Sequence, residues 1–163
     1  MTARAASKSE GEEPGATRHR AREVALQMLY HWEVGGVAMA EVLRTWPALS
    51  EDAGRLPDAL QAFAARLADG TAAAIASIDP LISEAASTWR IERMNVLDRL
   101  ILRLAIFEFL QERDTPASVI INEAIELARS FSADEAVPFV NGVLDAVKGR
   151  VERGELPAAP ERS

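Results

Sequence analysis

NVLDRLILRLAIFEFLQE, residues 95–112, is the stretch of sequence that decides the fold. It predicts a helix with apolar side chains on most sides, whereas a surface helix is apolar on one face only. Asn95, Arg99 and Arg103 are four apart and form a hydrophilic stripe in its first half. A helix of this kind packs in the middle of a bundle, so the stretch predicts a core helix with other helices around it.

The segments on both sides have apolar residues at three- and four-residue steps, which is the period of an α-helix. The second helix should stop at Pro47, and Asp79 should cap the fourth, with Pro80 at its first position. No segment shows the alternation that is typical of a strand. Helices are therefore expected at about residues 17–34, 38–46, 58–76, 80–86, 95–112, 117–131 and 136–151.

These elements predict an all-α fold of about seven helices in two small packed helical-bundle halves. The first half is expected at residues 17–78 and includes an arginine-rich first helix, and the second is expected at residues 79–152. Residues 1–16 are polar and lack an apolar period, so they are expected to form a disordered N-terminal tail. Residues 153–163 are expected to form a flexible C-terminal tail.

The composition limits the class of protein. The 163 residues are 48% hydrophobic, which is enough for one domain or two small packed halves. No apolar run reaches the roughly 18–20 residues of a membrane helix, no secretory signal is visible, and the absence of cysteine excludes disulfides and thiolate sites. A cytoplasmic protein is expected. The net charge of −7 opposes general association with nucleic acid, so any RNA contact must be a local basic site.

The sequence contains no recognisable enzyme motif. Glycine-rich phosphate loops and Ser/His/Asp frames are missing. The two histidines, His19 and His31, are twelve residues apart in one predicted helix, about 18 Å along its axis, which is too far for one metal ion. Glu123 and Glu126 lack the Glu-x-x-His spacing of di-iron bundles and are interpreted as solvated helix charges. We predict no catalytic residue, no cofactor and no metal site.

A basic cluster opens the first predicted helix. Arg18, His19, Arg20 and Arg22 crowd its N-terminal end, where free backbone N–H groups and the helix dipole favour an anion. Tyr30, further along, offers a ring on which a base could stack. The alternative interpretation is that these arginines are solvent-exposed charges of an amphipathic helix. The cluster alone does not decide between the two.

A second candidate site lies at the junction of the last two helices, FSADEAVPFVNG, residues 131–142. A helix N-terminus with two nearby aromatic rings can hold a phosphate and stack a base. The structural alternative is that Phe131 is a core residue, that Asp134 or Glu135 caps a helix, and that Gly142 allows close packing. The residues by themselves favour this alternative.

Several separated motifs together resemble the NusB family of transcription antitermination proteins. In chain order they are RHRAREVALQMLYHW at 18–32, WRIER at 89–93, DRLILRLAIFE at 98–108, INEAIELARSF at 121–131 and FVNGVLD at 139–145. The resemblance covers about residues 17–150. It implies an all-α fold made of two halves with three or four helices each.

The resemblance also implies a function. Such proteins bind the boxA element of nascent ribosomal RNA jointly with the small-subunit ribosomal protein that serves as Nus factor E, and the complex joins other Nus factors on RNA polymerase to prevent early termination. The ribosomal-protein face would include Glu92, Asp98 and Arg99. Carried over by position, the RNA-binding residues would be Arg18, His19, Arg20, Arg22, Gln27, Tyr30, Phe131, Glu135 and Phe139.

The chain departs from the family pattern in ways that weaken its basic character. His19 stands where an arginine is often found, and Ser118 and Pro138 stand where lysine is often found. Because an unperturbed imidazole is mostly neutral near pH 7, we expect weak RNA binding by the chain alone and tight binding with the ribosomal protein.

Two alternatives are kept beside this interpretation. NusB-like domains also precede the catalytic domain of some ribosomal RNA cytosine methyltransferases, but the cysteine nucleophile and the cofactor-binding fold of such an enzyme are missing from this sequence. The second alternative is a helical protein-binding scaffold or homodimer without direct RNA function. Alanine substitution of the arginine cluster separates the two, because only an RNA-binding protein should lose RNA affinity.

Overall fold

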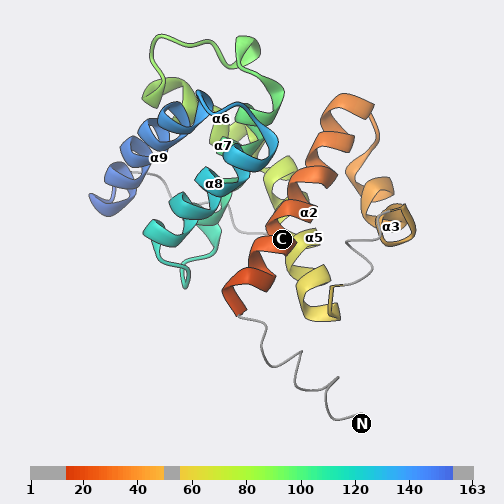
Figure 1. Ribbon diagram of the computed structural model, residues 1–163. Coiled ribbons are helices and arrows are strands. Elements are labelled where there is room, and N and C mark those ends of the chain that lie inside the picture. The colour runs from red at the N-terminus through yellow and green to blue at the C-terminus, as the bar shows by residue number, and fades with distance from the viewer. Residues whose placement is uncertain (1–13, 50–55, 156–163) are drawn as a thin grey trace.

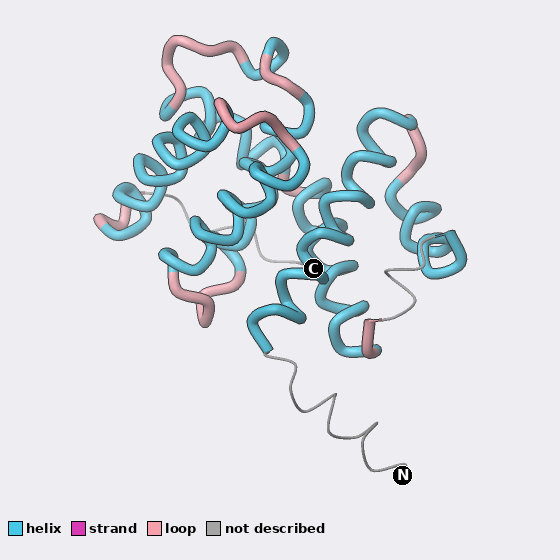
Figure 2. Tube along the Cα trace, viewed as in Figure 1, coloured by secondary structure: helices cyan, strands magenta, loops and turns pink. Residues whose placement is uncertain are grey.

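The computed structural model describes residues 14–49 and 56–155, and this part of the chain is built from helices without any strand. The predicted all-α fold of about seven helices is confirmed (Figures 1 and 2). The predicted bounds of the sixth helix and the start of the last are also confirmed. The elements are α2 (Pro14–Gly35), α3 (Met39–Leu49), α5 (Asp58–Ala73), α6 (Ile75–Ala85), the 3-10 helix η1 (Ile91–Arg93), α7 (Val96–Gln111), α8 (Ala117–Phe131) and α9 (Ala136–Glu152).

Helix α7 is the central element of the fold, as its sequence predicts. Asn95 caps its N-terminus by accepting a hydrogen bond from the backbone N–H of Leu97 at 2.9 Å. All residues from Leu100 to Leu110 are buried, because α7 contacts α2, α5, α6, α8 and α9. Each large apolar side chain that is fully buried contributes about 1.5–3 kcal/mol, so this helix stabilises the core on all its sides.

The other helices form two groups that meet at α7. Helices α2, α3 and α5 pack on one another, and α9 packs on both α6 and α8; the two groups are seen on the right and left of Figure 1. The chain passes from the first group to the second at Ala74, between α5 and α6. Residue 78, where the boundary of the halves was expected, lies inside α6.

The break between the third and fourth helices lies at Ala74 rather than at Asp79-Pro80, where the sequence predicted it. Ala74 has φ −103° and ψ 12°, and its N–H donates to carbonyls in the last turn of α5. Pro80 lies inside α6, where its missing N–H removes one backbone hydrogen bond without ending the helix. Asp79 is not a helix cap, because its carboxylate accepts two hydrogen bonds from Arg103, at 2.9 and 2.8 Å.

Two further helix bounds differ from the prediction, both at prolines. Helix α2 begins at Pro14, a residue type that the first helical turn accepts. Residues 14–16 of the expected disordered tail are therefore helical, while residues 1–13 and 156–163 of the two expected tails lie outside the described residues. Helix α3 continues through Pro47 to Leu49, because a proline this close to a C-terminus removes only one hydrogen bond of the helix.

Substitution of Gly70 on α5 tests how closely this helix packs on α7. A Cβ added at Gly70 would lie 2.2 Å from the tip of the Phe107 ring, which is buried in the core. Because the ring is buried in the close-packed core, we expect Gly70→Ala to lower the free energy of unfolding by about 1–3 kcal/mol. Urea denaturation followed by circular dichroism measures this change.

Gly142 in α9 provides the matched control. A Cβ added there would meet nothing within 4 Å, so the close packing considered for Gly142 in the sequence analysis is not found. Alanine should stabilise the middle of this helix by about 0.5–1 kcal/mol relative to glycine. If Gly70→Ala were as stable as Gly142→Ala, the described packing of α5 on α7 would be wrong.

Candidate nucleic-acid interface

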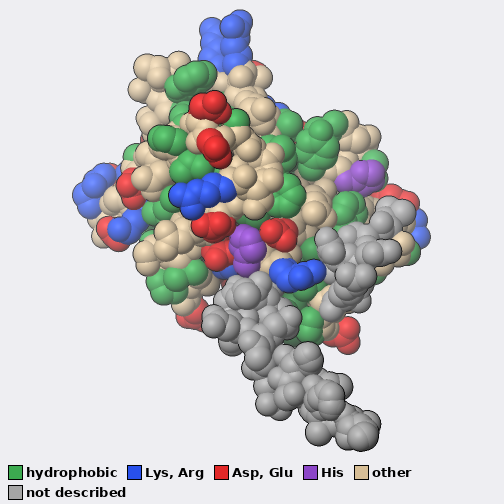
Figure 3. All heavy atoms as spheres, in the orientation of Figure 1, with side chains coloured by type: hydrophobic (Ala, Val, Ile, Leu, Met, Phe, Trp, Pro, Cys, Tyr) green, Lys and Arg blue, Asp and Glu red, His purple; other side chains and the backbone are tan. Residues whose placement is uncertain are grey.

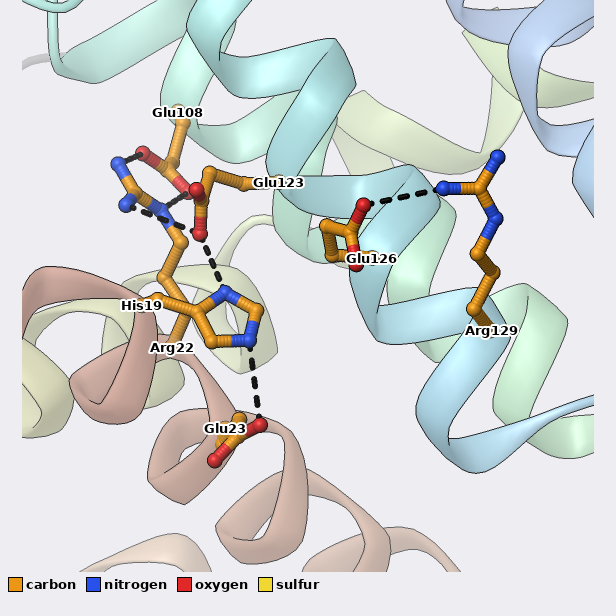
Figure 4. Close-up of polar contacts among 7 residues, drawn as sticks. All are labelled: His19, Arg22, Glu23, Glu108, Glu123, Glu126 and Arg129. Atoms are coloured by element: carbon orange, nitrogen blue, oxygen red, sulfur yellow. Dashed lines mark hydrogen bonds and ion pairs between the residues drawn. The ribbon is translucent and has the colours of Figure 1, made fainter. Parts of the chain in front are cut away.

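Arg22, in the arginine-rich start of α2, is buried and cannot reach RNA. The residue is only 2% exposed, and its Nε and Nη2 donate to the carboxylate of Glu108 on α7 at 2.8 and 2.9 Å (Figure 4). Burial alone would lower the pKa of Arg22, but the hydrogen bond and the negative charge of Glu108 outweigh it and raise that pKa. This is a correction: Arg22 joins α2 to α7 and is removed from the predicted RNA-binding residues.

His19 is held between two carboxylates. Its Nδ1 lies 2.6 Å from Oε1 of Glu123 on α8, and its Nε2 lies 3.1 Å from Oε2 of Glu23 on α2 (Figure 4). The Glu123 carboxylate also lies 3.7 Å from Nη1 of Arg22, so it joins α8 to α2. The interpretation of Glu123 as a solvated helix charge was therefore wrong, whereas Glu126 is an exposed charge on the same helix, as predicted.

Arg18 and Arg20 are the exposed cations at the start of α2. The guanidinium carbon of Arg18 lies 4.4 Å from the ring centroid of Phe63 on α5, a cation–π contact that orients the side chain. On the face of the molecule seen in Figure 3, blue basic and red acidic side chains are mixed around a histidine. The described part of that face is therefore not a continuous cationic strip, and a ligand would meet separate basic positions.

Three of the other predicted RNA-binding residues meet in one pocket although they are far apart in the sequence. Gln27 and Tyr30 of α2 and Phe131 at the end of α8 line a cavity of about 420 Å³, which we call the Tyr30 pocket. Tyr30 is 41% exposed, so its ring is available to a ligand. The rest of the lining is apolar or aromatic: Leu26, His31, Trp46 and Leu97.

The last two predicted RNA-binding residues, Glu135 and Phe139, line a second cavity of about 410 Å³ at the start of α9, which we call the Phe139 pocket. The ring of Phe139 meets that of Trp89 edge to face, with 5.8 Å between centroids and 64° between planes. Asp98 of α7 also lines this pocket and accepts a hydrogen bond from Ser132 Oγ at 2.5 Å. The pocket therefore combines two aromatic rings with two carboxylates.

The two pockets are neighbours at the place where the start of α7 meets the end of α8. Leu97 lines the Tyr30 pocket, and the next residue, Asp98, lines the Phe139 pocket. In the same way, Phe131 lines the Tyr30 pocket, and the next residue, Ser132, lines the Phe139 pocket. The middle of α2 and the start of α9 thus border adjoining pockets.

The sequence analysis missed the tryptophans that complete both pockets. Trp89 lies in the connector, residues 86–95, between α6 and α7, and it lines the Phe139 pocket. A signal was present in the motif WRIER, because base-stacking sites combine aromatic rings with cationic side chains. Trp46 lines the Tyr30 pocket only because α3 packs on α2, and neither helix pattern specifies that contact.

The three residues predicted for the ribosomal-protein face do not share one site. Asp98 lines the Phe139 pocket, whereas Glu92 and Arg99 line a polar cavity of about 500 Å³. Arg99 donates to the Glu33 carboxylate at 3.0 Å and to two backbone carbonyls of the connector at 3.1 and 3.3 Å. Arg99 therefore holds the connector and α2 against α7, and Glu92 is the exposed member of the three.

The histidines do not form a shared site. His19 lies between carboxylates, and the ring of His31 lies 5.8 Å from that of Trp46. Among the described residues, no group of three or more His, Cys, Asp or Glu side chains is placed to hold a metal ion. None of the described helices is both long enough and apolar enough to cross a membrane.

Comparison with known proteins places this arrangement in a family. The model of the NusB family matches residues 19–148, which include both pockets. This chain belongs to the NusB family. The transcription antitermination protein NusB of Myxococcus xanthus is 44% identical over 131 residues, which are 80% of this chain and 93% of that protein. NusB of Solibacter usitatus is 41% identical over 145 residues, which are 88% of this chain and 97% of that protein.

Solved NusB structures have the same fold. T. maritima NusB superposes with a TM-score of 0.73 at 30% identity and covers 88% of this chain and 93% of its own. A chain from the crystal structure of antitermination factors NusB and NusE in complex with dsRNA superposes with a TM-score of 0.72 at 25% identity, covering 82% and 97%. The predicted family and fold class are confirmed, and the family is one of transcription antitermination factors rather than enzymes.

The Arg22–Glu108 pair gives a prediction about stability. Arg22→Ala leaves the Glu108 carboxylate buried without its partner, so the free energy of unfolding should fall by about 3–5 kcal/mol. Glu108→Gln should also be destabilising, because it leaves the buried guanidinium without a counter-charge. Urea denaturation of the full chain measures both variants.

Arg44→Ala is the matched control for this measurement. Arg44 pairs with Glu41 on the surface of α3, at 2.6 Å, and its side chain is 69% exposed. Loss of such a pair should cost less than about 1 kcal/mol. A stability loss for Arg22→Ala no larger than that of Arg44→Ala would show that the buried pair does not hold α2 on α7.

Proposed function

We propose that this protein is an RNA-binding transcription antitermination factor of the cytoplasm. In this proposal it binds the boxA element of nascent ribosomal RNA together with the small-subunit ribosomal protein that serves as Nus factor E. The complex reaches RNA polymerase with other Nus factors and prevents premature termination of ribosomal RNA transcription. The observation that carries the proposal is the meeting of Gln27, Tyr30 and Phe131 in one pocket next to the pocket of Glu135 and Phe139, in a chain of the NusB family.

The chemistry of the two pockets suits an unpaired RNA strand. Bases splayed from a single strand stack on aromatic rings, which contributes about 1–3 kcal/mol per base, and Tyr30 and Phe139 supply such rings. Carboxylates such as that of Glu135 accept hydrogen bonds from base amino groups. Arg18 and Arg20, at the far end of α2, are the cations that meet phosphates in this proposal, and His19 contributes little because two carboxylates already occupy its ring nitrogens.

The charge distribution supports a requirement for the ribosomal protein. The net charge of −7 repels phosphate at long range, and Arg22 contributes to internal packing instead of RNA contact. A partner that itself binds ribosomal RNA supplies the missing positive charge. Glu92 and Asp98 remain the acidic residues proposed to contact that partner, whereas Arg99 acts within the fold.

Arg18→Ala combined with Arg20→Ala tests the RNA contact. The double variant should bind a fluorescent boxA-type RNA more weakly, because two phosphate contacts are lost. The slope of log affinity against log salt concentration should become shallower by about 0.7 for each lost contact with a single strand. Fluorescence anisotropy over a series of salt concentrations measures both effects.

Arg44→Ala combined with Arg150→Ala is the control, because it removes the same charge from α3 and from the end of α9. Both control arginines are paired with carboxylates on the protein surface. We expect the control to keep the wild-type salt slope. Unchanged RNA binding in the Arg18 and Arg20 variant would reject the proposed contact and favour a helical protein-binding scaffold or homodimer without direct RNA function.

Titration with the ribosomal protein tests the second part of the proposal. We expect the affinity for boxA-type RNA to rise by at least about tenfold, or 1.4 kcal/mol, when the ribosomal protein that serves as Nus factor E is present in excess. A gel-shift titration with and without this protein measures the difference. Equal affinities in the two titrations would contradict the requirement for a partner.

A further inference from the structure

We infer that the connector carries a further RNA contact, in which Trp89 stacks on an unpaired base beside Phe139 while Arg90 and Arg93 meet the adjoining phosphates. The inference rests on the proposed function, since it extends the same RNA surface beyond the Phe139 pocket. It assigns a ligand to residues of the motif WRIER, to which the sequence analysis gave no RNA contact.

Trp89 is exposed in a way that suits stacking. It is 56% exposed, and among the described residues it is the most exposed of the large hydrophobic side chains. Its ring meets Phe139 edge to face, so flat ring surface stays open to a ligand instead of being covered by a parallel ring. An exposed apolar residue is common on protein surfaces, and the inference therefore depends on what surrounds this one.

The two arginines that follow Trp89 in the connector, Arg90 and Arg93, have no carboxylate partner among the described residues. Other exposed arginines, such as Arg44 and Arg129, are paired with glutamates, whereas the side chains of Arg90 and Arg93 form no such pair within residues 14–49 and 56–155. Glu92 stands between them in sequence but lines a different cavity. Arg93 lines the same pocket as Trp89, and Arg90 is the exposed residue next to Trp89 in the chain. Cationic side chains near an open aromatic ring are the combination that non-specific single-strand sites use.

The Phe139 pocket connects these residues to the rest of the surface. Trp89 and Arg93 line it together with Glu135 and Phe139, which the proposed function already assigns to RNA. Its volume of about 410 Å³ falls within the range of about 300–1,000 Å³ that is usual for small-molecule sites. A strand that occupies the Phe139 pocket therefore meets Trp89 and Arg93 of the connector.

The part of the connector that lines the Phe139 pocket, Trp89 and Arg93, fits RNA better than a basic protein ligand, whereas Glu92, in a different cavity, remains the residue proposed to contact the partner. The partner proposed for this protein binds ribosomal RNA and must carry basic side chains to do so, and these would be repelled by Arg90 and Arg93. Phosphates are attracted by the same two arginines. Charge complementarity therefore favours the RNA strand as the occupant of this part of the surface.

Substitution of Trp89 in the full chain tests the inference. With the fluorescent boxA-type RNA as probe, Trp89→Ala should weaken binding by about five- to 150-fold, the range that corresponds to loss of one stacked base. Trp89→Phe should restore most of the affinity, because a ring remains. Arg90→Gln with Arg93→Gln should make the salt slope shallower by about 0.7 for each phosphate contact.

Val119→Ala is the control for loss of exposed apolar surface. Val119 is 40% exposed on α8 and lines neither the Tyr30 nor the Phe139 pocket, so this variant should bind RNA as the wild type does. Thermal denaturation should show that Trp89→Ala and Val119→Ala are folded at the temperature of the binding measurement.

The outcomes separate the inference from the proposed function. If Trp89→Ala binds RNA as the wild type does while the Arg18 and Arg20 variant does not, the inference is overturned and the proposed function stands. If Trp89→Ala weakens binding of the ribosomal protein but not of RNA, the connector is a protein interface and the inference is overturned. If the wild type binds no boxA-type RNA with or without the ribosomal protein, both fail.

Discussion

The buried ion pair between Arg22 and Glu108 determines where the arginine-rich helix lies. Both residues are 2% exposed, and removing a charge from water costs several kcal/mol for each ion unless a well-placed partner compensates it. The pair therefore favours one placement of α2 on α7, and Glu123 links α2 to α8 near the same point. With the helix held in this way, Tyr30 is brought to the end of α8, where the two pockets adjoin.

Ion pairs within the fold hold other arginines besides Arg22. Several arginines of the described chain are neutralised within the fold: Arg22 and Arg103 are buried against carboxylates, and Arg99 holds the connector. Most of the other described arginines, among them Arg18 and Arg93, are exposed, on a chain whose net charge is −7. In the proposed function, attraction of phosphate is therefore confined to short range, and this favours a strand that also fits the aromatic pockets.

The helices could be predicted from sequence where one periodic pattern was sufficient, and this was so for α7, α8 and the start of α9. The Asp79-Pro80 pair was misinterpreted because the same two residues suit a helix start, and only the distant Arg103 gives Asp79 a different role. Arg22 was misassigned for a similar reason. A motif rich in arginine does not reveal which of its members turns inward, since that depends on the position of Glu108, 86 residues away.

The complete burial of α7 between Leu100 and Leu110 also limits how the protein can be dissected. An isolated fragment ending near Ala74 would expose the apolar sides of α2 and α5 to water, because the helix that covers them comes later in the chain. An isolated fragment beginning there would expose one side of α7. The two groups of helices are therefore not separable modules, and a shortened version that keeps only the arginine-rich helix and its neighbours would lack the interior that gives the helix its orientation.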